Sequence, residues 1–191
     1  MTSDLDRRLL LGIARQAMVA HVTGGSIARD EAGSLANRRG GAFVSLHHQN
    51  ELRGCIGHIE ADRFLLDVVA ECAVAACSSD PRFAPITAPE LHAITIELSL
   101  LGTLEPIATP AEIEIGQHGL VVEKGWQRGL LLPQVATEWK WNREQFLEAT
   151  CHKAGLARDA WKQGAQLWRF EAEVFAEAVA PGSSQYPTRP T

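Results

Sequence analysis

The residues best suited to chemistry are gathered around Cys55. Residues 52–58 read Leu-Arg-Gly-Cys-Ile-Gly-His, so two glycines flank a cysteine inside a stretch that otherwise resembles a β-strand. Glycine destabilises a strand interior and usually marks a bulge or a close backbone approach. Positive charge from the neighbouring Arg53 and His58 would lower the pKa of the Cys55 thiol. A lower pKa favours the thiolate, which is the form that acts as a nucleophile or metal ligand. The segment therefore predicts a reactive cysteine.

A structural role for Cys55 is the alternative. Free cysteine is among the most buried residue types, and a simple two-residue turn would place Cys55 on the same strand face as Val44 and Leu46. The neighbouring pair His47 and His48 does not suggest a metal site, because adjacent strand side chains point to opposite faces. Reactive and structural interpretations both remain open.

Two further segments combine a turn with a functional side chain. In Asp80-Pro81-Arg82-Phe83, the turn would hold the Arg82 guanidinium to bind a carboxylate or phosphate with two hydrogen bonds. Alternatively, the segment ends a helix, with Asp80 paired to Arg82 and Phe83 in the core. In Gln117-His118-Gly119, the glycine would let His118 face a cleft as an acid, a base or a donor, although a plain turn also explains it.

The strand predicted at residues 94–100 has a polar face. Apolar and polar residues alternate along it, which is typical of a strand with one wet face. Glu97 and Ser99 share the polar face and would line a cleft, or simply lie on an exposed sheet surface.

Composition limits the classes of function. The chain has 191 residues, 46% of them hydrophobic, and a net charge of −5, which is typical of a globular protein and disfavours general binding to nucleic acid or anionic membranes. No stretch is long and apolar enough to span a bilayer, and four scattered cysteines indicate reduced thiols, so we expect a cytoplasmic protein. No metal site and no cofactor-binding motif is evident.

Periodicity predicts an α+β fold of mostly antiparallel strands with packed helices, because a hairpin followed by a helix occurs twice. The first helix has a capping box at Ser3 and ends at Gly24, and Asp62 is expected to cap the second. All five tryptophans lie beyond residue 125, and we expect them to anchor the core or the two lobes rather than stack nucleobases. The predicted helices cover residues 5–20, 62–77 and 142–153, and the predicted strands residues 42–47, 52–59, 94–100, 120–124, 129–132 and 166–178.

Together, six short segments make the chain resemble the AMMECR domain family, named for a chromosomal region linked to Alport syndrome with elliptocytosis. The resemblance covers about residues 5–177, and the segments occur in the family's order. His58 departs from the pattern, because relatives often carry a small hydroxyl residue there. The segments are Leu-Arg-Gly-Cys-Ile-Gly at 52–57, Asp-Pro-Arg-Phe at 80–83, Glu-Leu-Ser at 97–99, Gly-Gln-His-Gly at 116–119, Leu-Pro-Gln at 132–134 and Cys-His-Lys-Ala-Gly-Leu at 151–156.

The resemblance implies an α+β fold of two unequal lobes with a cleft between them. We accordingly expect one domain over residues 1–180, with a larger lobe at 1–105 and a smaller lobe at 106–180, followed by a flexible tail at 181–191. The resemblance also implies a Memo-like protein and a radical S-adenosylmethionine enzyme as partners, and modification of a nucleic-acid base or another metabolite.

The resulting hypothesis is a cysteine-dependent enzyme with its site in the cleft. Cys55 would be the nucleophile and His118 the acid or base. The alternative is a non-catalytic binding or adaptor module that uses the same residues as a recognition pocket, and RNA binding is a third hypothesis that the acidic charge disfavours. The expected substrate-binding residues are Arg53, Gly54, Gly57, Arg82, Glu97 and Ser99.

Overall fold

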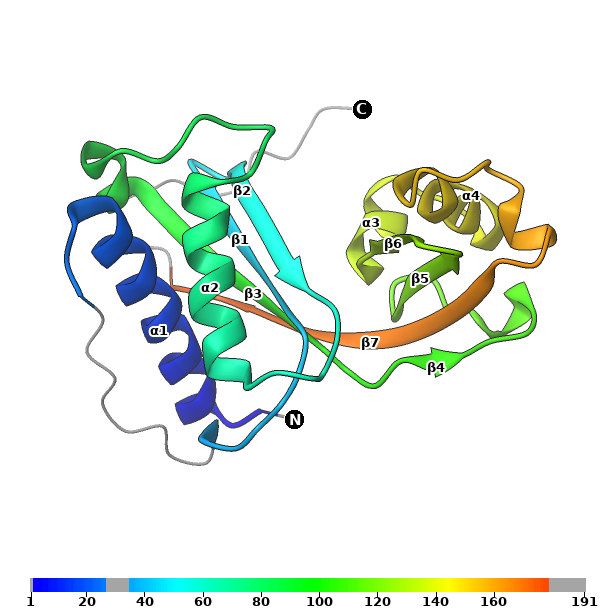
Figure 1. Ribbon diagram of the computed structural model, residues 1–191, viewed down its shortest axis with the longest axis horizontal. Coiled ribbons are helices and arrows are strands. Elements are labelled where there is room, and N and C mark those ends of the chain that lie inside the picture. Colours follow the sequence, from blue (N-terminus) through cyan, green and yellow to red (C-terminus); the bar gives the residue numbers. More distant parts are fainter. Residues whose placement is uncertain (1, 27–34, 179–191) are drawn as a thin grey trace. The chain divides into compact units, whose positions relative to one another are not determined.

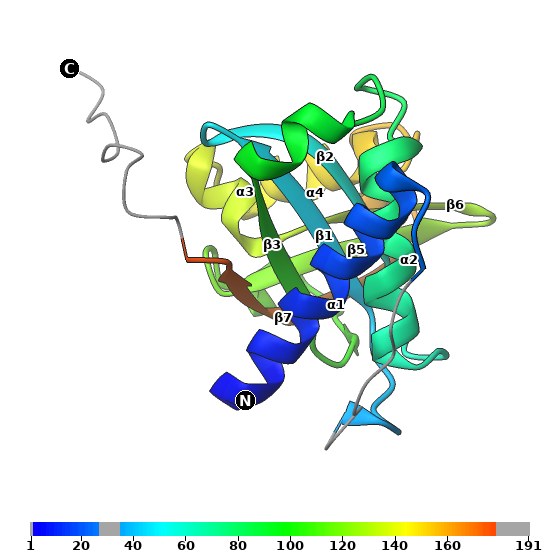
Figure 2. The same cartoon turned by 90° about the vertical axis from the view of Figure 1, so that its left-hand side faces the viewer.

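The computed structural model describes residues 2–26 and 35–178 (Figures 1 and 2). These residues form two compact units, a larger one made of residues 2–26, 35–100 and 174–178 and a smaller one made of residues 101–173. Strands pair antiparallel in both units, and helices pack on them, so the predicted α+β class is confirmed. The predicted tail at 181–191 lies outside the described residues.

In the larger unit, helices cover one face of an antiparallel sheet with strand order β2-β1-β3. Figures 1 and 2 show α1 and α2 side by side over that face. Side chains from the helices and from alternate strand positions form one buried core. The elements are α1 (Asp4–Thr23), β1 (Ala42–His48), β2 (Glu51–His58), α2 (Leu65–Ser78), the 3₁₀ helix η2 (Ala88–Ala93) and β3 (Ile94–Leu101).

The caps of the helices show which local predictions hold. The Ser3 hydroxyl accepts a hydrogen bond from the Asp6 N–H, and Gly24 ends α1 with φ +73°, both as predicted. The prediction that Asp62 caps α2 is wrong, because α2 begins at Leu65 with Phe64 as its N-cap. Asp62 lies too early in the chain to cap this helix, and its carboxylate contacts His58 instead.

In the smaller unit, helices pack on antiparallel strands in the order β6-β5-β7-β4, and β7 is also the neighbour of β3, so all seven strands belong to one sheet. The sequence analysis missed α3, although Pro133 stands at its first turn, where the missing N–H of proline costs no helical hydrogen bond. The elements are β4 (Glu105–Pro106), η3 (Pro110–Glu112), β5 (His118–Lys124), β6 (Gln127–Leu131), α3 (Pro133–Glu138), α4 (Arg143–Lys153), η4 (Ala160–Lys162) and β7 (Gln166–Ala176), whose last residues enter the larger unit.

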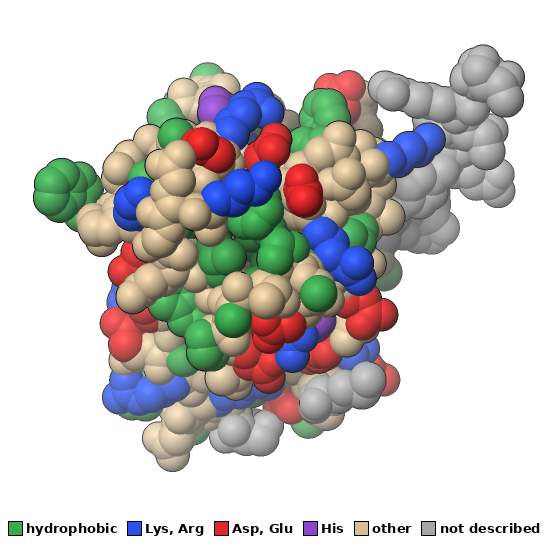
Figure 3. All heavy atoms as spheres, turned by 90° about the vertical axis from the view of Figure 1, so that its right-hand side faces the viewer, with side chains coloured by type: hydrophobic (Ala, Val, Ile, Leu, Met, Phe, Trp, Pro, Cys, Tyr) green, Lys and Arg blue, Asp and Glu red, His purple; other side chains and the backbone are tan. Residues whose placement is uncertain are grey.

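The tryptophans do not all anchor a core. Trp141 and Trp161 pack against the core of the smaller unit, but Trp126 is 96% exposed and Trp139 is 67% exposed. The core-anchor prediction is therefore wrong for Trp126 and Trp139, which stand at a hairpin turn and just after a helix end, where no described element covers them. Figure 3 shows hydrophobic side chains on one face of the smaller unit, bordered by Lys, Arg, Asp and Glu. No helix in the described part of the chain is long and apolar enough to cross a membrane.

Candidate functional site

A β-bulge determines the direction of the Cys55 side chain. Gln49 and Asn50 form a two-residue turn with φ of 52° and 68°. Beyond the turn the pairing of β1 and β2 shifts by one residue between Leu46 and His47, so that Arg53 has no cross-strand partner. Without this shift Cys55 would pair with Val44 and face the core, as the simple register predicts. The observed partner of Cys55 is Ser45, and the predicted core-facing register is therefore wrong.

The bulge places Cys55 on the sheet face opposite the helices. Val44 and Leu46 point into the core, so the alternate positions of β1 and its neighbours point to the other face. On that face the cross-strand partners Cys55, Ser45 and Glu97 form one row from β2 through β1 to β3. Neighbouring rows contain Gly57, Phe43 and Ser99 on one side and His47 and Thr95 on the other. We call these residues the cysteine face.

Asp80 and Arg82 hold the backbone of Cys55 in place. The Cys55 N–H donates to Asp80 Oδ2 at 2.8 Å, and Arg82 Nη2 donates to the Cys55 carbonyl at 3.3 Å. Arg82 also donates to both oxygens of Asp80, from Nε at 2.9 Å and from Nη2 at 2.7 Å. Because β2 is the edge strand of its sheet, this pair also occupies backbone groups that another chain could otherwise bind.

The ion pair of Asp80 and Arg82 lies close to Cys55. The guanidinium of Arg82 holds the pKa of Asp80 far below its ordinary value, although burial of the carboxyl opposes this. The pKa of Arg82 is raised mainly by its hydrogen bonds with Asp80, and the side chain of Cys55 contributes in the same direction. Arg82 is thus the cation that contacts Cys55, at the carbonyl, whereas the sequence neighbours Arg53 and His58 contact Glu90 and Asp62.

Cys55 differs from the other three cysteines in its surroundings. Its side chain is half-buried, and the Ser45 hydroxyl donates a hydrogen bond to Cys55 Sγ at 3.3 Å. Cys72, Cys77 and Cys151 are buried, and burial raises the pKa of each thiol, that of Cys72 to about 11. A hydroxyl that donates to sulfur stabilises a thiolate, which makes Cys55 the cysteine best placed for reaction.

Arg53 is engaged in contacts within the larger unit. Its Nε donates to Glu90 at 3.1 Å, and its two terminal nitrogens donate to the carbonyls of Ala84 and Pro85 at 2.6 and 3.3 Å. The half-buried guanidinium thus fixes the segment between α2 and η2 to the sheet. These contacts account for Arg53 without a substrate.

The two glycines beside Cys55 are required by packing. A Cβ on Gly54 would lie 2.2 Å from the carbonyl oxygen of Ala76 in α2. A Cβ on Gly57 would lie 2.3 Å from the ring of Phe43. The glycines therefore let a helix and an aromatic ring approach β2, and no substrate contact is needed to explain them.

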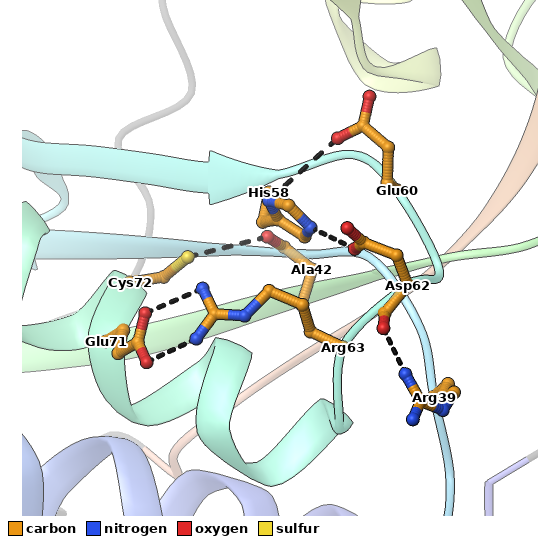
Figure 4. A network of polar contacts seen from close by, with 8 residues as sticks. All are labelled: Arg39, Ala42, His58, Glu60, Asp62, Arg63, Glu71 and Cys72. Carbon is orange, nitrogen blue, oxygen red and sulfur yellow. Dashed lines mark hydrogen bonds and ion pairs between the residues drawn. The ribbon is translucent and has the colours of Figure 1, made fainter.

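His58 points to the helix side of the sheet, away from the cysteine face. Figure 4 shows its ring beside Asp62, with His58 Nε2 at 2.7 Å from Asp62 Oδ1. The hydrogen bond from His58 lowers the pKa of Asp62 below its ordinary value. Nearby, Arg63 pairs with Glu71, and Cys72 Sγ lies 4.0 Å from the carbonyl oxygen of Ala42 (Figure 4). His58 therefore fixes the segment after β2.

His118 belongs to the smaller unit, whereas the other candidate residues belong to the larger one. It is 7% exposed, and its Nδ1 accepts a hydrogen bond from the Glu114 N–H at 3.0 Å. An Nδ1 that accepts this bond carries no proton, so the neutral ring has its proton on Nε2. His118 also lines a polar hollow of about 500 Å³ together with Arg169 and Glu171.

Two buried polar atoms on the cysteine face lack a hydrogen-bond partner within the described residues. They are Oγ of Ser99, a residue that is 1% exposed, and Nε2 of His47. Buried polar atoms are normally paired, so such atoms are expected where water or a ligand binds. The sequence analysis dismissed His47 as a metal ligand and did not place it beside Cys55. Over residues 2–26 and 35–178, no group of three or more His, Cys, Asp or Glu residues is arranged to hold a metal ion.

Comparison with known proteins identifies the class. The AMMECR1 family model matches residues 11–175. The chain is 43% identical over 179 residues to a protein of Methanothermobacter thermautotrophicus, and the match covers 89% of this chain and 93% of that one. It is 41% identical over 189 residues to a protein of Aeropyrum pernix, and the match covers 94% of this chain and 82% of that one. The crystal structure of an uncharacterized protein from Pyrococcus horikoshii has a TM-score of 0.82 and 36% identity, covering 88% of this chain and 90% of that one. This chain therefore belongs to the AMMECR1 family.

Proposed function

We propose that this protein is a thiol-dependent enzyme that binds a small polar metabolite on the cysteine face. The observation that carries the proposal is the bulge at Arg53, which turns Cys55 from the core to the polar face. A cysteine used only for packing would need no bulge, and bulges are frequent next to active sites, where they redirect a side chain. The Ser45 hydroxyl, which donates to Cys55 Sγ, and the Arg82 guanidinium, which donates to the Cys55 carbonyl, support the same assignment.

In this proposal each polar residue around Cys55 has a separate task. Arg82 and the Ser45 hydroxyl stabilise the Cys55 thiolate. Glu97 is the proton acceptor, because it is half-buried, lies directly across from Ser45 and forms no side-chain hydrogen bond or ion pair with other described residues. Ser99 and His47 offer the unpartnered atoms that bind polar groups of the substrate.

The reaction class is nucleophilic substitution at an electrophilic carbon. The Cys55 thiolate forms a bond to that carbon, and the leaving group departs with the electron pair of the broken bond and takes a proton from solvent. A water molecule then attacks the carbon, and Glu97 accepts a proton from this water. The carbon–sulfur bond breaks with its electron pair on sulfur, which regenerates the thiolate, and Glu97 returns the proton to solvent.

Intact-protein mass spectrometry tests this function. The wild type, Cys55→Ser and Glu97→Gln are incubated with a small-molecule extract of cells, and each spectrum is searched for an added mass. Glu51→Gln serves as the control, because Glu51 is an exposed carboxylate on β2. We expect an adduct on Cys55 that accumulates in Glu97→Gln, is unaffected by Glu51→Gln and is absent from Cys55→Ser. The absence of an adduct from the wild type and from every variant would contradict the proposed enzyme.

A binding module is the second candidate function. It is favoured by Ser99 Oγ and His47 Nε2, which have no hydrogen-bond partner among the described residues and would hold a ligand without a bond to Cys55. Such a module would present a metabolite to the proposed partners, a Memo-like protein and a radical S-adenosylmethionine enzyme. Retention of one small molecule by both the wild type and Cys55→Ser, without an adduct, would support this second function.

A further inference from the structure

The smaller unit contains a hollow of about 480 Å³ that the proposed function does not use. Its walls come from the end of β6, from α3 with the turn that follows it, and from α4. Trp139, Trp141, Lys153 and Arg158 line it, and we call it the aromatic hollow. Lys153 belongs to one of the six segments that carry the family resemblance, but it has no role in the cysteine face.

The end of α3 places the two indole rings together. Lys140 adopts a left-handed conformation with φ 53°, a position usually taken by glycine or asparagine, and the Trp141 N–H donates to the Ala136 carbonyl at 2.9 Å. This turn stacks the rings of Trp139 and Trp141, with their centroids 5.8 Å apart and their planes 17° from parallel. Trp141 packs against the core, whereas Trp139 is 67% exposed. The pair is therefore an anchored ring that supports an exposed one.

The charges beside the rings are mainly positive. Lys153 and Arg158 are both exposed, and neither forms an ion pair or hydrogen bond with another residue in the described ranges. Lys153 at the end of α4 is partly explained by the helix dipole, but Arg158 lies beyond the helix. Glu148 is the one carboxylate among the described residues that line this hollow, so its formal charge is +1 with His152 neutral, in a chain of net charge −5.

We propose that the aromatic hollow binds small planar aromatic anions. The ligand ring stacks on Trp139, and its phosphate or carboxylate group pairs with Lys153 and Arg158. Aromatic rings stack on tryptophan whatever their hydrogen-bonding edge, so the shared chemistry is a flat ring with an anionic group. Two classes of ligand combine a flat ring with an anionic group, namely nucleoside phosphates and aromatic carboxylates. This inference does not depend on the reaction proposed for Cys55.

A second exposed tryptophan supplies a matched control. Trp126 also lines a hollow, of about 420 Å³, but no second described ring supports it, and the ammonium group of Lys124 in that hollow donates to the Gln163 carbonyl at 2.9 Å. Trp126→Leu therefore removes an exposed indole without affecting the aromatic hollow. Lys162→Gln is the control for the loss of one positive charge, because Lys162 lies over the ring of Trp161 and does not line the aromatic hollow.

Calorimetric titration tests the proposal with four probes. Adenosine 5′-monophosphate and indole-3-acetate contain both a ring and an anion, adenosine contains the ring alone, and ribose 5-phosphate contains the anion alone. We expect at least one of the first two probes to bind with a dissociation constant below about 10 mM and more tightly than both partial probes. Trp139→Leu should weaken that binding at least about fivefold, the lower end of a stacking contribution. Trp126→Leu and Lys162→Gln should leave it unchanged.

The two ligand sources give different results. Binding of adenosine 5′-monophosphate alone assigns the hollow to nucleoside phosphates, and binding of indole-3-acetate alone assigns it to aromatic carboxylates. NMR signals of the indole N–H groups should identify Trp139 as the residue perturbed. The proposal is overturned if neither aromatic anion binds, if ribose 5-phosphate binds as tightly as adenosine 5′-monophosphate, or if Trp139→Leu binds like the wild type.

Discussion

The substitution Asp80→Asn should destabilise the larger unit because it removes the charge that holds both Arg82 and the Cys55 backbone. The Asp80 side chain is 2% exposed, and its oxygens accept four hydrogen bonds, from the Cys55 N–H and from the N–H, Nε and Nη2 of Arg82. Hydrogen bonds to charged groups contribute about 1.5–3 kcal/mol each, but such values are not additive.

The size of the effect follows from the exposure of the two partners. Breaking a buried ion pair costs about 3–5 kcal/mol. The side chain of Arg82 is 50% exposed, so water replaces part of its lost interaction, and the amide oxygen that the substitution introduces would still accept from the Cys55 N–H. We therefore expect Asp80→Asn to lower the free energy of unfolding by about 2 kcal/mol. The exposed pair Arg63 and Glu71 is the control, and Glu71→Gln should cost less than about 1 kcal/mol.

Urea unfolding followed by far-UV circular dichroism measures the difference, because α1 and α2 of the larger unit dominate the helical signal. Tryptophan fluorescence is unsuitable, since all five tryptophans lie in the smaller unit. Hydrogen exchange should also show faster exchange of the Cys55 amide in the variant. A midpoint of Asp80→Asn within error of that of Glu71→Gln would refute the reasoning.

The effect of Asp80→Asn should depend on pH. The pKa of Asp80 is lower in the folded protein than its ordinary value of 3.8. A carboxyl with a lowered folded pKa contributes stability that is complete above the unfolded pKa and is lost as the pH falls toward the folded pKa. The difference between the wild type and Asp80→Asn should therefore be constant near neutral pH and shrink below about pH 4. A difference that grows in acid would contradict this sign.

Two further predictions concern the sheet and the segment after β2. Gly54→Ala should lower the free energy of unfolding by about 2 kcal/mol or more, because its Cβ would meet the backbone of α2. Gly12→Ala has open space around its Cβ in α1 and should raise the free energy of unfolding by about 0.5–1 kcal/mol. Both are measured by the same urea titration. The Asp62 carboxyl should titrate below its ordinary value of 3.8 by NMR, and His58→Ser should move that titration upward. Equal costs for the two glycine variants, or an Asp62 titration that His58→Ser does not move, would each contradict the corresponding contact.

The sequence predicted the elements better than it predicted where their side chains point. Hydrophobic periodicity and turn residues located both hairpins, and the cap at Ser3 is confirmed. The direction of Cys55 could not be predicted from the pattern, because one unpaired residue in β2 reverses the faces of all residues beyond it. The two glycines around Cys55 were the available signal for a bulge, but the residue without a cross-strand partner is Arg53.

The candidate site was predicted in part. The strand residues Glu97 and Ser99 share one sheet face with Cys55. His47 was missed, since its placement depends on the register, and Arg82 replaces Arg53 as the cation that contacts Cys55. Such contacts connect residues that are distant in the chain, and local patterns carry no information about them.

The rate at which each cysteine is alkylated in the folded protein tests the central claim most directly, because iodoacetamide reacts with accessible thiolate and burial blocks it. Peptide mass spectrometry separates Cys55 from Cys72, Cys77 and Cys151, whose burial makes them internal controls. We expect Cys55 to react at least about tenfold faster than the other three at neutral pH, and more slowly in Arg82→Gln and Ser45→Ala. If Cys55 stays as inert as Cys72 until the protein is unfolded in urea, the cysteine face is not a reactive site and the proposed function is wrong.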